Sequence, residues 1–413
     1  MGDATAFASA LVLVLLIGLL ALGSAALTRR VALPGPAFLL LGAALAARIV
    51  PGVHAPTDTT VERIVTVALV AILLDGGMQV GWPRFRAEAG AITLTGVVGT
   101  ALTIAGAALV THLAVGVDGY QSLLVGTAVA PTDPAVVFSV LGERVAAGGA
   151  GTILAGESGV NDPVGIALMA AVLGAGHLGM SAVVQVGSRF LSAMAVGAAV
   201  GVVGGGMLRR LVVRGERSGG RLTPFLTAAG ALLLYGGATL AHGSGFLAVF
   251  AAGIVLGGRQ NRSGRQNRSG RRLERFHVAA AGIGEMVVFT VLGLTVDLSE
   301  LARTDVWLPG IVLGAVLVLA VRPVLVGASL LPVDLPRTER SFVLLSGLKG
   351  AVPLLLGLLL VAAHVPDASR LYGIVVVVVV FSVVVQGTLT PHLAAALHLS
   401  AGDGDPDPPA GGA

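Results

Sequence analysis

The sequence predicts an all-α polytopic membrane protein of about 13 transmembrane helices, a class that three observations indicate. Hydrophobic residues make up 55% of the 413-residue chain, charged residues only 12%, and the mean hydropathy is +0.92. A water-soluble domain of this size needs more charge to cover its surface. Apolar runs long enough to cross a bilayer recur along the chain, and its 60 glycines suit closely packed membrane helices.

The apolar runs define the expected spans in chain order. The first, at 5–27, follows Asp3 rather than a basic segment, so we expect a permanent helix and not a cleaved signal. The remaining spans are expected at roughly 33–50, 61–80, 89–116, 120–141, 150–174, 181–208, 222–241, 244–258, 277–296, 306–331, 341–363 and 369–397. Residues 1–400 are thus expected to form one membrane domain, and the acidic, Pro-rich tail at 401–413 to be disordered.

The charges indicate an orientation. With the N-terminus outside, 19 arginines fall in loops on the inner side and 5 on the outer side, which predicts a cytoplasmic C-terminus in a plasma membrane protein.

The formal net charge of +4 does not indicate nucleic-acid binding, because the basic residues lie in these short loops. The Arg-rich loop at 259–275 is a solvated linker or a site for anionic lipid headgroups. The absence of cysteine excludes thiol catalysis and thiolate metal sites.

Two spans contain polar breaks. The fifth is interrupted by Pro131-Thr132-Asp133-Pro134, and the twelfth carries Ser346-Gly347-Leu348-Lys349-Gly350-Ala351-Val352-Pro353. Six spans, a linker span and six more spans would form two repeats of inverted topology, in which these breaks correspond. In transporters built this way the substrate site lies where the corresponding breaks meet.

Ionisable residues inside the membrane are costly and usually functional. Seven lie within the expected spans: Asp75, Asp133, Glu157, Asp162, Glu285, Arg322 and Lys349. Five acids against two bases leave a deficit of positive charge that a bound cation or protons would fill. Glu157 and Asn161 share one helix face, and Ser158 and Asp162 the neighbouring one, so oxygen ligands gather in this segment. Pro131 and Pro163 also release backbone carbonyls.

The other charges have structural interpretations. A buried charge needs a partner, so Arg322 is expected to neutralise Glu157. Lys349 would offset the helix ends at its break, or pair with Glu285. Asp75 either lines an access path or lies near a span end within reach of water. The histidines lie near expected span ends or in loops, and we interpret them as surface residues.

These motifs resemble those of monovalent cation/proton antiporters of the CPA1 (NhaP-type) group. The resemblance rests on Thr132-Asp133-Pro134, the run from Glu157 to Pro163, Arg322, and the run from Gly347 to Pro353. The Asp75-Gly76-Gly77 segment is also similar, as is the segment from Glu285 to Leu294. Lys349 departs from the family's usual arginine at that position, as in some members associated with potassium.

The resemblance implies an NhaA/NhaP-like fold with crossed discontinuous helices. Spans 4–6 and 11–13, about 89–174 and 306–397, would form an ion-translocating core, and spans 1–3 and 7–10 a scaffold that makes a homodimer. Asp133 and Asp162 would bind the metal cation, Na+ or possibly K+ or Li+, and exchange protons. Ser158 and the Thr132 carbonyl would complete the shell, with Glu157 acting through water. Asn161, in place of a second aspartate, marks the electroneutral variant.

The resemblance therefore predicts a transporter that needs no cofactor and is not an enzyme. Two alternatives stay open at the level of the sequence. Asp133 and Asp162 could form the dyad of an intramembrane aspartyl protease, although neither has a Gly-x-Gly-Asp setting. A passive cation channel would need a continuous pore and usually ring symmetry, whereas the paired breaks favour alternating access.

Overall fold

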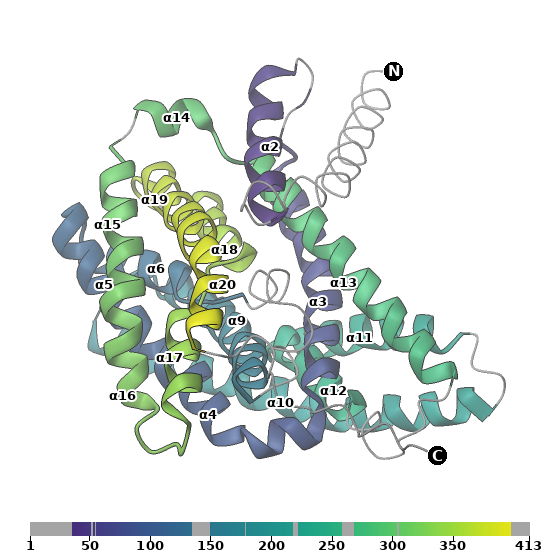
Figure 1. Cartoon of the computed structure of the whole chain (residues 1–413). Coiled ribbons are helices and arrows are strands. Elements are labelled where there is room, and N and C mark those ends of the chain that lie inside the picture. The colour runs from purple at the N-terminus through teal and green to yellow at the C-terminus, as the bar shows by residue number, and fades with distance from the viewer. Residues whose placement is uncertain are drawn as a thin grey trace, which may run out of the picture.

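The computed structural model describes residues 35–50, 53, 55–133, 149–177, 179–217, 222–257, 268–303 and 305–397. These residues form helices joined by short segments, and they contain no strand, which confirms the all-α prediction (Figure 1). The expected first span at 5–27, Pro134, most of the Arg-rich loop and the tail at 401–413 lie outside the described residues.

A described helix lies in each expected span from the second to the thirteenth, although several bounds differ and the second part of the fifth span lies outside the described residues. The first half contains α2 (Gly35–Ile49), α3 (Asp58–Ala87), α4 (Ala89–Thr93), the π-helical segment η1 (Leu94–Gly99), α5 (Thr100–Val115), α6 (Gly119–Val129), α9 (Gly149–Ala175) and α10 (Met180–Arg217). The second half contains α11 (Thr223–Leu240), α12 (Gly245–Gly257), α13 (Arg268–Leu294), α14 (Leu298–Arg303), α15 (Trp307–Val316), η2 (Leu317–Val326), α16 (Gly327–Ser329), α17 (Arg337–Leu345), α18 (Ala351–Ala362), α19 (Ala368–Phe381), η3 (Ser382–Gln386) and α20 (Gly387–Ala396). Eight helical stretches in the described chain are long and apolar enough to cross a membrane.

The helices fall into two sets that pack mainly within themselves. In one, α3 packs against α12 and α13, α12 against α10, and α13 against α2; in the other, α5 packs against α6 and η2, and α19 against α15 and α18. Helix α9 contacts α3, α10 and α12 of the first set and α5, α6 and α18 of the second. Helix α9 therefore links the two sets, and it carries the polar run from Glu157 to Asp162.

Glycine lets α3 and α12 approach closely. A Cβ atom at Gly77 would collide with the backbone carbonyl of Phe250 and lie 3.0 Å from the Cα of Gly253. Small residues at helix contacts allow this backbone proximity in membrane proteins. The contact fixes the position of Asp75, which lies half a turn earlier on α3.

Both predicted breaks are present, and they meet. Helix α6 ends at Val129 and is followed by non-helical residues 130–133, while residues 346–350 separate α17 from α18. Pro131 contributes no N–H group and disfavours helical geometry at the residue before it. The backbone N–H of Asp133 donates to the carbonyl of Leu348 at 2.8 Å, so the two interrupted spans contact each other at their breaks.

Two glutamates lie at the start of α9, outside the candidate spans. A Cβ atom on Gly149 would lie 2.9 Å from Glu339 Oε2 and 3.7 Å from Glu88 Oε1. The positive end of the α9 dipole favours negative charge there. Even so, burial raises the pKa of the Glu88 carboxyl above its ordinary value of 4.5, and the charge of Glu339 adds to this effect.

Replacing Glu88 by Gln is expected to stabilise the protein at neutral pH. The folded protein holds the Glu88 proton to a higher pH than the unfolded chain, so the free energy of unfolding falls as pH rises from about 4.5 through the raised pKa. Gln lacks this penalty, so the variant's thermal midpoint should exceed that of the wild type near pH 7 and converge with it near pH 4. A difference independent of pH would show that the side chain acts through packing and not through charge.

Candidate functional site

Opposite charges compensate the helix ends at the two breaks. Lys349 Nζ donates to the carbonyl of Ala130 at 2.8 Å, at the C-terminus of α6, where the helix dipole is negative. The side chain of Asp133 lies against Gly350 at the N-terminus of α18, where a Cβ atom would collide with the carboxyl group. Of the two roles expected for Lys349, the structure shows the helix-end contact; no ion pair joins it to Glu285 in the described chain.

Replacing Lys349 by Met is expected to lower the free energy of unfolding by about 2 kcal/mol, because the negative end of α6 loses its buried cation. Lys349→Arg keeps the charge and is the matched variant, which should stay close to the wild type. Thermal unfolding in detergent measures both. Equal destabilisation by Met and Arg would show that the shape of the lysine, and not its charge, is what the break requires.

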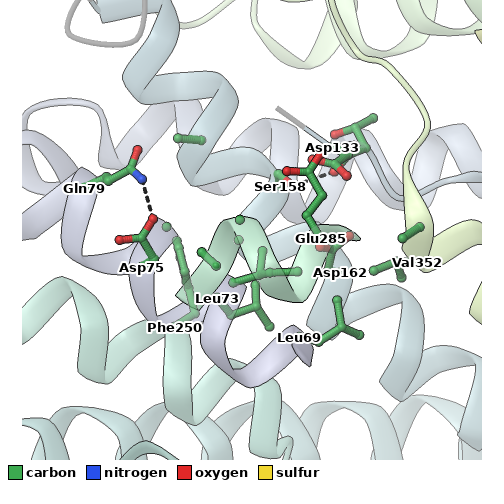
Figure 2. A pocket seen from close by; sticks show the side chains of 18 of the residues that line it. Leu69, Leu73, Asp75, Gln79, Asp133, Ser158, Asp162, Phe250, Glu285 and Val352 are labelled. Atoms are coloured by element: carbon green, nitrogen blue, oxygen red, sulfur yellow. Dashed lines mark hydrogen bonds between the residues drawn. The ribbon is translucent and has the colours of Figure 1, made fainter. Parts of the chain in front are cut away.

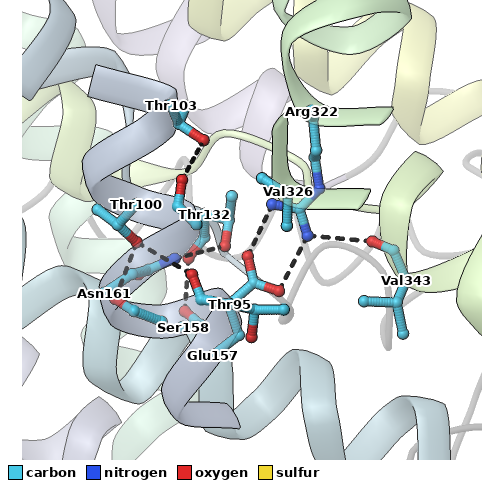
Figure 3. A network of polar contacts seen from close by, with 12 residues as sticks. Thr95, Thr100, Thr103, Thr132, Glu157, Ser158, Asn161, Arg322, Val326 and Val343 are labelled. Carbon is cyan, nitrogen blue, oxygen red and sulfur yellow. Dashed lines mark hydrogen bonds and ion pairs between the residues drawn. The ribbon is translucent and has the colours of Figure 1, made fainter. Parts of the chain in front are cut away.

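A hydrogen-bonded cluster joins the first break to α9. Ser158 Oγ donates to the Thr132 carbonyl at 2.5 Å, and Asn161 Nδ2 donates to Thr132 Oγ1 at 2.8 Å (Figure 3). Thr132, Ser158 and Asn161 are each at most 5% exposed. The segment that carries Asp133 is therefore held against the helix that carries Asp162.

Glu157 and Arg322 form the ion pair expected from the sequence. Arg322 Nη1 lies 2.7 Å from Glu157 Oε1, and Nη2 lies 3.0 Å from Oε2 (Figure 3). The guanidinium also donates to the carbonyls of Val343 and Leu344, each at 3.0 Å. With exposures of 2% and 5%, the two charges satisfy each other and tie α9 to η2 and α17.

Each described π-helical segment lies beside a polar feature of the site. Arg322 is on η2 together with Pro323, and Gly96 of η1 lies against α9 at Glu157, where an added Cβ atom would be 3.3 Å from the Glu157 carbonyl oxygen. On η3, Ser382 Oγ accepts from the backbone N–H of Lys349 at 2.9 Å and Gln386 Nε2 donates to the Leu345 carbonyl at 2.9 Å. Such bulges are frequent at functional sites.

Sequence reasoning missed Ser382 and Gln386. The signal was a polar pair four residues apart within a valine-rich run, where one turn of helix brings the two side chains together. Ser382 Oγ donates to Gln386 Oε1 at 2.7 Å, so the pair acts as one unit that holds the second break.

A cavity of about 290 Å³ lies where α3, α9, α13 and the two breaks meet (Figure 2). Its lining is Leu69, Ile72, Leu73, Asp75, Gly76, Gln79, Thr132, Asp133, Ala155, Ser158, Gly159, Asp162, Phe250, Val278, Ala281, Gly282, Glu285, Phe289, Ala351, Val352 and Pro353. Four carboxylates and one serine hydroxyl thus share a largely apolar cavity, a setting that favours a cation.

The structure separates the predicted site residues into two groups. Those that line the cavity are Asp75, Thr132, Asp133, Ser158, Asp162 and Glu285. Those that lie outside its lining are Glu157, Asn161, Arg322 and Lys349. The second group is engaged in the hydrogen bonds and ion pair described above, which position the residues of the first group. Asp75 accepts a 2.6 Å hydrogen bond from Gln79, a partner that the sequence reasoning had not named.

Comparison with known proteins gives a consistent result. Residues 12–396 match the family described as sodium/hydrogen exchanger, transmembrane. The K(+)/H(+) antiporter NhaP2 of Shewanella sp. strain MR-4 is 32% identical over 80% of this chain and 56% of its own length. The K(+)/H(+) antiporter NhaP of Alkalimonas amylolytica is 31% identical over 85% of this chain and 60% of its own length. The chain thus spans somewhat more than half the length of these relatives.

Two further proteins are matched over a larger share of their own length. The Na(+)/H(+) antiporter NhaP of Pseudomonas aeruginosa is 27% identical over 79% of each chain. The structure of the sodium proton antiporter MjNhaP1 from Methanocaldococcus jannaschii superposes with a TM-score of 0.78 at 19% identity, covering 96% of this chain and 99% of that one. The family match over most of the chain and the shared fold lead to one conclusion: the chain belongs to the sodium/hydrogen exchanger family of multi-pass membrane proteins.

Proposed function

We propose that this protein is a secondary active antiporter that exchanges a monovalent cation, Na+ or K+, for protons. The observation that carries the proposal is the cavity in which Asp133 and Asp162 lie with Ser158. The cavity lies beside two helix breaks, where Lys349 offsets the negative end of α6. The relatives reported above are K(+)/H(+) and Na(+)/H(+) antiporters, which supports this cargo. Neither an intramembrane protease nor a passive channel finds support in the family assignment.

Competition for the two aspartates couples the fluxes. A cation favours the ionised carboxylates and a proton removes that charge, so one site holds either cargo but not both. Closing an empty, ionised site off from water has a large desolvation cost, whereas closing a site that holds a cation or protons does not. The transporter therefore changes the face that its site opens to only when the site is loaded, and this requirement exchanges one cargo for the other. Asn161 in place of a further carboxylate supports electroneutral exchange.

Two cavities that α9 helps to line support alternating access. The first is lined by the middle turns of α3 and α13, by α9 and by the two breaks. A second, of about 530 Å³, is lined by Ile166, Arg189, Tyr235 and Phe246 among others, near the end of α9 and the start of α10. Ile166 lies about 6 Å along the helix axis from Asp162, one turn of α9. One turn of α9 thus separates Asp162 from the lining of the second cavity.

The moving parts follow from the packing of the two helix sets. We assign about 89–174 and 306–397 to an ion-translocating core, and the remaining spans to a scaffold that forms a homodimer. The assignment is supported by the contacts of α3, α10, α12 and α13 with one another. The arginine distribution supports a plasma membrane orientation with the N-terminus outside and the C-terminus in the cytoplasm.

Ion flux in proteoliposomes tests the function. The purified protein is reconstituted with a pH dye inside, and NaCl, KCl or LiCl is added outside, with and without a clamp on the membrane potential. Cation-driven pH change that ignores the clamp supports electroneutral exchange and identifies the ion. Cation uptake without coupled proton flux would instead indicate a channel, and no response to any of the three salts between about pH 6 and 9 would refute the antiporter proposal.

A further inference from the structure

Glu285 is a carboxylate in the cavity that the two-aspartate mechanism does not use. Figure 2 shows its side chain reaching from α13 toward Asp133, Ser158 and Asp162. Glu285 and Asp133 line the same cavity, so their carboxylates would repel each other if both were ionised without a cation between them. No hydrogen bond or ion pair joins Glu285 to another residue in the described part of the chain. Asp75 differs from Glu285, because it accepts a hydrogen bond from Gln79 and lies apart from the side chains of Asp133, Ser158 and Asp162.

The surroundings of Glu285 give the carboxylate no compensating positive charge. Its neighbours in the lining on α13 are Val278, Ala281, Gly282 and Phe289, all without charge. An ionised carboxylate in such a setting is costly unless a cation approaches it, and without a cation it is neutralised by a proton. In the described chain no three acidic or histidine side chains converge tightly enough to hold a metal ion between them. A cation near Glu285 would therefore keep part of its water and be attracted by charge rather than held in a closed shell.

Glu285 and the two aspartates belong to different helix sets. Asp133 and Asp162 are carried by the first break and by α9, whereas α13 packs chiefly against α3 and α2. If the two sets move relative to each other, as proposed above, the aspartates leave Glu285 behind. A charge that stays with the scaffold stabilises the cation only in the state that this structure represents.

We propose that Glu285 is a side-specific cation-recruiting carboxylate, which lowers the concentration of Na+ or K+ needed at the face where this cavity opens and leaves the opposite face unaffected. This inference rests on the proposed antiport. It assigns the protein an asymmetry between its two faces, because a ligand present in one state changes the free energy of that state alone.

Sided transport assays on Glu285→Gln test the proposal. Right-side-out and everted membrane vesicles present opposite faces to the added cation, and a pH dye reports exchange in both. The apparent KM for the cation should rise roughly tenfold at one face, with little change in maximal rate and little change in KM at the other face. Glu285→Asp keeps the charge on a shorter side chain and should recover most of the affinity. Glu62→Gln removes an exposed carboxylate of α3 that does not line the cavity, and it should match the wild type.

The assays distinguish a failure of the antiport proposal from a failure of the role assigned to Glu285. A wild-type protein without exchange would refute antiport itself. Wild-type exchange with an equal change of KM at both faces, or with no change at either, would overturn the role of Glu285. Loss of all exchange in both Glu285→Gln and Glu285→Asp would also overturn it, because a recruiting charge is not required for turnover. Thermal unfolding of each variant in detergent ensures that only folded proteins are compared.

Discussion

Replacing Asp162 by Asn is expected to abolish cation/proton exchange, with a loss of roughly 100-fold or more, while the helical fold is retained. The carboxylate lies on α9, 8% exposed, in the cavity with Asp133 and Ser158. Asn has nearly the same shape but can neither lose a proton nor carry the charge that binds a cation. The site would then lack the group for which the two cargoes compete, so neither flux could drive the other.

Proteoliposome flux measured over a range of pH is the assay for this variant. Asp334→Asn is the matched control, since Asp334 is exposed on the connection before α17 and should leave exchange unchanged. Thermal unfolding in detergent checks that Asp162→Asn is folded, and removal of a buried carboxylate is expected to leave it at least as stable as the wild type. Exchange near the wild-type rate in the folded variant would show that Asp162 does not carry the cargo.

Arg322→Gln is expected to destabilise the protein by about 3–5 kcal/mol, the largest stability effect that the structure implies. The substitution leaves Glu157, 2% exposed, without its guanidinium partner. It also removes the donors that hold the carbonyls of Val343 and Leu344 at the end of α17. An uncompensated buried charge destabilises a protein by more than an intact buried ion pair stabilises it. Most of the destabilisation is therefore expected to come from the Glu157 carboxylate left without a partner.

A double variant separates the two contributions. In Glu157→Gln with Arg322→Gln both charges are gone, and much of the lost stability should return because no charge remains buried alone. Thermal unfolding in detergent gives the comparison, and the flux assay then reports on transport. Exchange by the stable double variant would show that Glu157 supports the fold and takes no part in ion binding. An Arg322→Gln variant as stable as the wild type would contradict the assigned role of the ion pair.

The sequence predicted those features that depend on single residues or on their immediate neighbours. Hydropathy located the spans. Proline indicated the first break at Pro131, because it lacks an N–H donor and disfavours helical geometry at the residue before it. The Arg322–Glu157 pair was also predictable, since a lone buried charge is so costly that a distant partner must exist. The same argument was ambiguous for Lys349, whose partner is the carbonyl of Ala130 and not a carboxylate.

Features that depend on where helices begin were harder to predict. His277 was interpreted as a surface residue near a span end, but α13 begins at Arg268, so His277 lies well inside the helix and is 1% exposed. Its Nε2 lies 2.6 Å from Thr227 Oγ1 of α11. The basic, polar start of α13 hid this extension, because hydropathy marks where a chain is apolar and not where its backbone hydrogen bonds begin.

The sequence by itself determined the membrane class, the two breaks and the set of charges that must be compensated, since each follows from the cost of placing a given side chain in lipid. Only the tertiary structure decided which carboxylates line the cavity and which support it. Glu157 and Asp162 are one and a half turns apart on α9, yet the former binds Arg322 and the latter lines the cavity. That division depends on how η2, α13 and the breaks pack around α9, and contacts between residues more than a hundred positions apart leave no periodic trace in a single sequence.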